Sequence, residues 1–131
     1  MVLARERGLQ MLRAGKIAES IPLLQEALEE DSTDLQTYLA LGLAFSRQGE
    51  FDRAAETLEA AVSIAPTSAQ AHYNLGVAYH RLHNLTLAKE EYLRALGLDP
   101  TYTPAKTALD LLLREQADVG HEHETSDSAD G

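Results

Sequence analysis

The chain has 131 residues, no cysteine and a formal net charge of −10, so it is long enough for one domain and a modest tail. The lack of cysteine excludes disulfides and thiolate metal sites, and no stretch approaches the ~18–20 apolar residues that span a bilayer. The lack of such a stretch predicts no membrane insertion, and because acids outnumber bases by 21 to 11, we predict no nucleic-acid binding. The opening residues lack the apolar core of a secretory signal, which predicts a cytoplasmic location.

Small and apolar residues recur every 34 positions through residues 1–102, without insertion. A period of this length is typical of stacked copies of one supersecondary unit, each of which needs its neighbours to bury its apolar face. We therefore place repeats at 1–34, 35–68 and 69–102. The columns that define the register are Gly8, Gly42 and Gly76; Ala27, Ala61 and Ala95; Leu24, Leu58 and Tyr92; Met11, Phe45 and Tyr79; Ile17, Phe51 and Leu85.

Each repeat is predicted to form two antiparallel helices joined by a tight turn, and the second repeat has the clearest pattern. Its apolar residues follow the helical spacing of three or four, Gly49 and Glu50 interrupt them, and Pro66 ends the second helix. Asp34 and Ser68 precede first helices, where a short polar side chain can cap free amides. The alternating small and large residues are expected to interlock across facing helices.

These columns resemble the motif of the tetratricopeptide repeat family, although the first repeat matches least well and has Ser20 in place of an alanine. Pro22 predicts a mild kink in that repeat's second helix, or a late start. The resemblance implies an all-α fold, a right-handed α-solenoid of three 34-residue helix-turn-helix repeats plus a C-terminal capping helix. The matching residues are Tyr38, Leu41, Gly42, Phe45, Ala54, Leu58, Ala61, Pro66, His72, Leu75, Gly76, Tyr79, Ala88, Tyr92, Ala95 and Pro100.

A further helix is predicted over residues 103–116, because Thr103 and Pro104 form a cap followed by a first-turn proline. Its single apolar stripe resembles the helix that closes tetratricopeptide stacks, so we assign the repeat domain to residues 1–116. Residues 117–131 are polar and acidic without periodicity, and we predict that this tail is disordered.

The family's geometry places the first helix of each repeat on a concave face, where two columns favour binding. Four aliphatics in one column, from Leu9 to Leu111, predict an apolar strip of the kind that marks binding sites, unless they only pack against neighbouring helices. Three arginines in another column suit carboxylates, although basic residues are also common at helix C-termini. The predicted partner-binding residues are Leu9, Arg13, Leu39, Leu43, Arg47, Tyr73, Asn74, Val77 and Arg81.

The leading hypothesis is a non-catalytic adaptor whose groove holds a peptide or helical segment of a partner protein, with apolar and acidic residues. Some family members clamp a C-terminal carboxylate with Lys, Asn and Arg side chains. Arg5 and Asn74 stand at two such positions here, but Leu9, Ala40 and Gln70 stand at others, which argues against that clamp.

Two alternatives remain: a self-assembling scaffold that stacks through its terminal repeats, and an acidic tail that competes with the ligand for the arginines. The polar Arg7 and Gln10 on the first repeat count against stacking, so we predict a monomer or a weak homo-oligomer. No catalytic set, cofactor or metal is predicted. His72, His80 and His83 are interpreted as structural or solvated residues, because no carboxylate or cysteine completes a ligand set.

Overall fold

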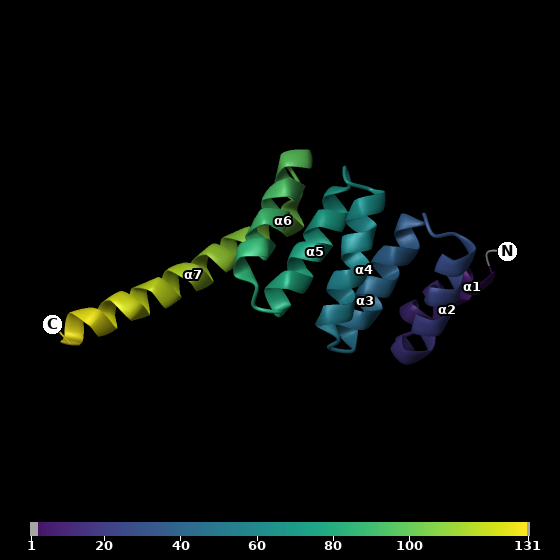
Figure 1. Ribbon diagram of the computed structural model, residues 1–131, viewed down its shortest axis with the longest axis horizontal. Coiled ribbons are helices and arrows are strands. Elements are labelled where there is room, and N and C mark those ends of the chain that lie inside the picture. Colours follow the sequence, from purple (N-terminus) through teal and green to yellow (C-terminus); the bar gives the residue numbers. More distant parts are fainter. Residues whose placement is uncertain (1–2, 131) are drawn as a thin grey trace.

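The computed structural model describes the backbone of residues 3–130 and the side chains of residues 3–118. Within these residues the chain is all-α, without strands, and no helix is both long enough and apolar enough to cross a membrane. The predicted solenoid of three helical hairpins and a capping helix is confirmed (Figure 1). The helices are α1 (Leu3–Arg13), α2 (Ile17–Glu30), α3 (Leu35–Arg47), α4 (Phe51–Ile64), α5 (Ala69–Arg81), α6 (Leu85–Leu98) and α7 (Thr103–Asp130).

Each helix packs against the next one in the chain, and the first helices of successive repeats also contact one another. The hairpins therefore lie side by side in chain order, with the chain ends at opposite ends of an elongated molecule (Figure 1). Because α1 contacts α3, α3 contacts α5 and α5 contacts α7, these first helices form one continuous surface along the stack.

The turn inside each hairpin is the same in all three repeats. Gly15, Gly49 and His83 occupy one column and have positive φ angles of 81°, 78° and 61°. The backbone N–H that follows each of them donates to a carbonyl five residues earlier at 2.9 Å, which closes the end of the first helix. Glycine adopts this left-handed conformation without a Cβ penalty, whereas histidine does so only occasionally. The turn geometry is thus retained in the third repeat although the glycine is not.

The glycine column marks the closest approach of the two helices in a hairpin. A Cβ at Gly42 would lie 2.7 Å from Leu58, and one at Gly76 would lie 2.7 Å from the Tyr92 ring. Both large side chains are almost fully buried. The predicted interlocking of small and large residues is therefore confirmed.

The local predictions for the helix starts have different outcomes. Ser68 caps α5 as expected, since its hydroxyl accepts the Ala71 N–H at 3.1 Å. Asp34 precedes α3 but makes no side-chain capping hydrogen bond, and its carboxylate instead accepts from the Thr37 hydroxyl. In α2 the helix starts at Ile17, so Pro22 lies inside it and the alternative of a late start is wrong. Pro22 and Ala18 are both exposed, so water can satisfy the carbonyl that the missing proline N–H leaves free.

The last helix begins at Thr103 as predicted but does not end at residue 116. It continues to Asp130, so residues 117–130 are helical here, in contrast to the disordered tail that we expected. Continuation of an existing helix needs no new nucleus, and this stretch contains no proline to break it. Side chains after Asp118, and residue 131, lie outside the part that the structure describes.

Replacing Gly76 by alanine is expected to destabilise the fold by about 1–3 kcal/mol, because the new Cβ overlaps the Tyr92 ring and approaches the Ala88 carbonyl. Gly97→Ala is the matched control: no atom lies within 4 Å of its Cβ position, so the change is expected to be neutral or stabilising by up to about 1 kcal/mol. Denaturant unfolding of both variants measures the difference. Equal effects would contradict the packing role of the glycine column.

Candidate functional site

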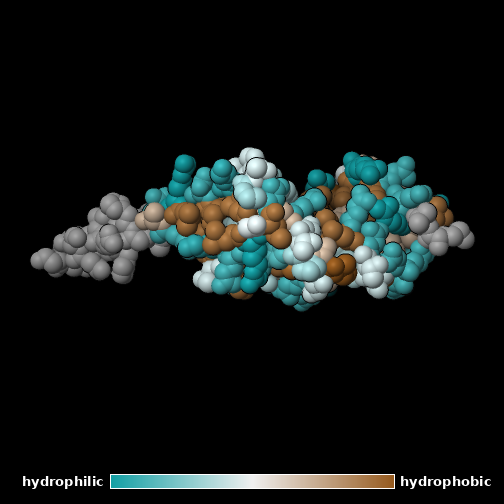
Figure 2. Space-filling view, turned by 90° about the horizontal axis from the view of Figure 1, so that it is seen from above, coloured by the Kyte–Doolittle hydropathy of each residue, from teal (hydrophilic) through white to brown (hydrophobic). Residues whose placement is uncertain are grey.

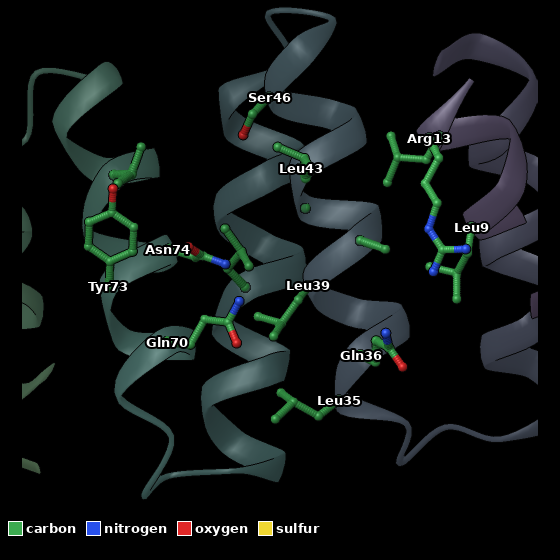
Figure 3. Close-up of a pocket in the computed structure, with 15 residues that line it drawn as sticks. Leu9, Arg13, Leu35, Gln36, Leu39, Leu43, Ser46, Gln70, Tyr73 and Asn74 are labelled. Atoms are coloured by element: carbon green, nitrogen blue, oxygen red, sulfur yellow. The ribbon is translucent and has the colours of Figure 1, made fainter. Parts of the chain in front are cut away.

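The surface formed by the first helices is hollowed into a groove of about 760 Å³ between α1, α3 and α5 (Figure 3). Leucine and valine side chains form most of its floor, and the amides of Gln36, Gln70 and Asn74 stand among them. The groove is lined by Leu9, Leu12, Arg13, Leu35, Gln36, Leu39, Ala40, Gly42, Leu43, Ser46, Leu58, Gln70, Tyr73, Asn74 and Val77.

The helix α3 supplies the centre of the groove because it is apolar on two sides. Leu35, Leu39 and Leu43 recur every four residues and face the groove, as Figure 3 shows. Leu41 and Phe45 lie on the other side and are buried against neighbouring helices. A helix that needed only to pack in the stack would require one apolar stripe, so the second stripe calls for another explanation.

The central leucine of the groove is open to solvent. Leu43 is 44% exposed, whereas its neighbours in sequence, Gly42 and Ala44, are buried. Leu9, Leu39 and Val77 are partly buried. The apolar strip is therefore packed against the stack on one side and open to solvent on the other.

Most of the predicted binding residues meet in this groove, but two arginines do not. Arg47 lines neither this groove nor the hollow beside it, and Arg81 lines only the adjacent hollow. The guanidinium of Arg81 lies 4.9 Å from the centre of the Phe51 ring, a cation–π contact across the α4–α5 boundary. The predicted residues that do line the groove are Leu9, Arg13, Leu39, Leu43, Tyr73, Asn74 and Val77.

The adjacent hollow has a volume of about 550 Å³ and shares Val77 with the groove. It was not predicted, and it contains the basic side chains His80, Arg81 and His83 together with the apolar Phe51 and Leu111 and the carboxylate of Glu115.

His80 is the residue of this hollow that ties α5 to the helices after it. Its ring nitrogens lie 3.1 Å from the Tyr92 hydroxyl and 2.8 Å from the Glu115 carboxylate. Burial, with a smaller contribution from Tyr73 and Glu115, raises the pKa of Tyr92 above its ordinary value. Glu115 stands in the column of Arg13, Arg47 and Arg81, so this column of basic residues ends in an acidic one.

His72 has a structural role. One ring nitrogen lies 2.7 Å from the Glu91 carboxylate and the other 2.8 Å from the Pro66 carbonyl, so both have partners within the protein. Glu91 also accepts a hydrogen bond from Arg94 at 2.6 Å. No group of three potential metal ligands occurs among the residues that the structure describes.

The N-terminal edge of the groove holds an ion pair. Arg5 donates to Asp34 at 2.5 Å and also to the Gln36 side chain, while Thr37 donates to Asp34 at 2.6 Å. Burial opposes ionisation of Asp34, but the hydrogen bonds from Thr37 and Arg5 outweigh it and hold the pKa of Asp34 below its usual value. Arg5, which stands at a clamp position of the family, is therefore engaged within the protein.

Sequence reasoning omitted Leu35, Gln36, Ser46 and Gln70 from the site. Gln36 and Gln70 share a column of the 34-residue register, on a face that the family's geometry makes concave. That repetition was a usable signal.

A family model described as tetratricopeptide repeat matches residues 5–69 and 39–103, most of the chain. The chain therefore belongs to the tetratricopeptide repeat family. No curated protein gives a significant match.

The solved structures similar to this chain share its fold. The first repeat domain of Spaghetti (RPAP3), bound to the HSP90 peptide SRMEEVD, is 24% identical over 88% of this chain and 92% of that domain, with a TM-score of 0.84. The second such domain of human RPAP3, in complex with the HSP70 peptide SGPTIEEVD, is 20% identical over 85% and 92%, with a TM-score of 0.81. YrrB, described as having an unusual peptide-binding site, is 27% identical over 77% and 52%, with a TM-score of 0.73.

The lowered pKa of Asp34 predicts an acid-sensitive contribution to stability. Because the folded pKa lies below the unfolded value of 3.8, ionised Asp34 stabilises the fold fully above that value. The contribution is lost as the pH falls through the folded pKa. We expect Asp34→Asn to be less stable than the parent at pH 7, with a difference that shrinks below pH 3.8. Denaturant unfolding across this range measures it, and a constant difference would contradict the ionic origin.

Proposed function

We propose that the protein is a non-catalytic interaction module that holds a segment of a partner protein in the groove between α1, α3 and α5. The observation that carries the proposal is that Leu43 is exposed in the centre of the groove, whereas the other apolar side chains of the strip are partly buried. An open apolar surface of this kind is typical of a site that is completed by a partner. A cytoplasmic location belongs to the same proposal.

The relatives of known structure support a peptide as the ligand. Two of the repeat domains described above were solved with peptides, one from HSP90 and one from HSP70. The groove is lined by residues of α1, α3 and α5 and has an apolar floor, which suits an extended peptide or one face of a helix.

The side chains of this groove favour an internal segment with apolar anchors over a chain end held by its carboxylate. Arg5 is paired with Asp34, and Leu9 and Ala40 bring no charge to the positions that they occupy. Neutral amides from Gln36, Gln70 and Asn74 can donate to and accept from a peptide backbone without a charged partner.

Acidic residues that flank the apolar anchors would meet the basic edge formed by Arg13, Arg47 and Arg81. All three side chains are exposed at the C-terminal ends of first helices. Burial of one leucine or valine contributes ~1.5–3 kcal/mol, whereas an exposed ion pair contributes ~0.2–1 kcal/mol. The apolar strip therefore carries most of the affinity, and the arginines set the orientation of the ligand.

Replacing Leu43 or Val77 by glutamate is expected to weaken binding at least about tenfold each, because each change puts a charge into the apolar floor. The partner segment is identified by affinity capture, synthesised as a peptide and titrated calorimetrically. Leu87→Glu is the control, since Leu87 is 37% exposed on α6 and lies outside the groove. Unchanged affinity in the Leu43→Glu and Val77→Glu variants, with intact helicity, would reject the groove.

Removal of Arg47 or Arg81 is expected to have a smaller effect, a loss of ~0.2–1 kcal/mol each that diminishes as salt is added. Titrations of Arg47→Ala and Arg81→Ala at low and high ionic strength with the same peptide measure it. A loss that does not depend on salt would show that these residues contribute packing and not charge.

A further inference from the structure

The C-terminal end of the stack leaves an apolar face uncovered. In the second and third repeats the second helix covers the first, and Leu41 and Leu75 are only 4% and 3% exposed. The capping helix α7 continues the register as a fourth first helix, with Leu109 in this same column. No helix follows α7 in the described residues, so Leu109 is only partly buried, and Leu113, in the column of Tyr79, is 40% exposed.

The second helix of the third repeat extends this face. Leu93 on α6 is 48% exposed and stands in the column of Glu59. At the boundary between α4 and α5, Glu59 accepts a hydrogen bond from the Tyr79 hydroxyl at 2.8 Å. The register puts Leu93 and Leu113 in the corresponding positions at the boundary between α6 and α7. Two exposed leucines thus replace a polar pair.

We call Leu93, Leu109 and Leu113 the end face. In Figure 2 a hydrophobic area extends along the described part of α7. In the interior of the stack the columns of Leu109 and Leu113 lie under a helix that runs antiparallel to the first helix, as α4 does for α3, where Leu41 and Phe45 are both only 4% exposed. The column of Leu93 stays exposed there, at Glu59. The missing occupant is therefore a helix antiparallel to α7.

A two-fold axis supplies that helix from a second copy, because the axis sets α7 antiparallel to itself. An axis midway between Leu109 and Leu113 brings Leu109 of each copy against Leu113 of the other. Asp110 and Arg114 are exposed beside this pair, and the antiparallel arrangement sets Arg114 of one copy near Asp110 of the other. Each α7 then acts as the missing second helix for its counterpart.

We propose that this protein forms a two-fold dimer in which the end face of each copy is covered by the α7 helix of the other. Residues 117–130 do not return over the face, because α7 continues as one helix to Asp130. Head-to-tail stacking would instead set α7 of one copy against α1 of another, with no second helix between them. It would also bury Arg7 and Gln10 of the second copy, which are exposed.

The end face is separate from the groove. Leu111, which is 54% exposed, lies in the column of Leu43 and Val77 and lines the hollow beside the groove. Dimerisation and peptide binding can therefore fail independently of each other.

Sedimentation equilibrium of the full chain from micromolar to submillimolar concentration tests the dimer. The mass of the parent is expected to rise from 14.3 kDa towards twice that value, and Leu113→Glu is expected to remain at 14.3 kDa throughout. Leu111→Glu is the matched control on the same helix and is expected to dimerise like the parent. Circular dichroism verifies that both variants are folded. A parent that stays monomeric, or a dimer that persists in Leu113→Glu, would overturn the proposal.

Cross-linking tests the orientation of the two copies, because the chain has no cysteine of its own. Asp110→Cys places a thiol beside the proposed axis, and a short bismaleimide is expected to convert most of it to covalent dimer. Asp52→Cys on α4 is expected to give little covalent dimer, since Asp52 is exposed away from the end face. Equal yields from the two variants would exclude the antiparallel α7 contact.

Discussion

The stack depends on the close contact of a glycine on the first helix of each repeat with a large side chain on the second. At Gly8, Gly42 and Gly76 a Cβ would come within 2.7–2.8 Å of the facing Leu24, Leu58 or Tyr92 side chain. A closer approach is blocked by the ring or branch, and a wider one would leave a void that water cannot fill. One contact per repeat therefore sets the spacing of each hairpin, and the other helix contacts follow from it.

This spacing also explains the groove. When α4 covers one side of α3, the row of Leu35, Leu39 and Leu43 is left facing the neighbouring first helices α1 and α5. These helices are held apart by the second helices between them, so their facing side chains do not close over the row. The groove is thus a consequence of how the hairpins stack, and its chemistry is set by side chains that the stack does not need.

The two ends of the groove differ in charge. At the N-terminal ends of the first helices, Arg5 is neutralised by Asp34, which is held ionised by its hydrogen bonds. At the C-terminal ends, the arginines are exposed and Glu115 closes the row next to His80. In the proposed binding mode, a ligand with acidic residues at one end would place that end beside these exposed arginines.

The sequence by itself determined the repeats, the turns and most of the groove, because each repeat contacts only its neighbours and every structural role recurs at a fixed spacing. Prediction failed where the repetition stops. The stacking of Arg81 on Phe51, the link from His80 to Glu115 and the uncovered Leu113 all depend on contacts between elements that no column of the register describes. Only the tertiary structure decided these features: the Arg81–Phe51 contact joins α5 to α4, and the other two arise where α7 continues the stack without a second helix of its own.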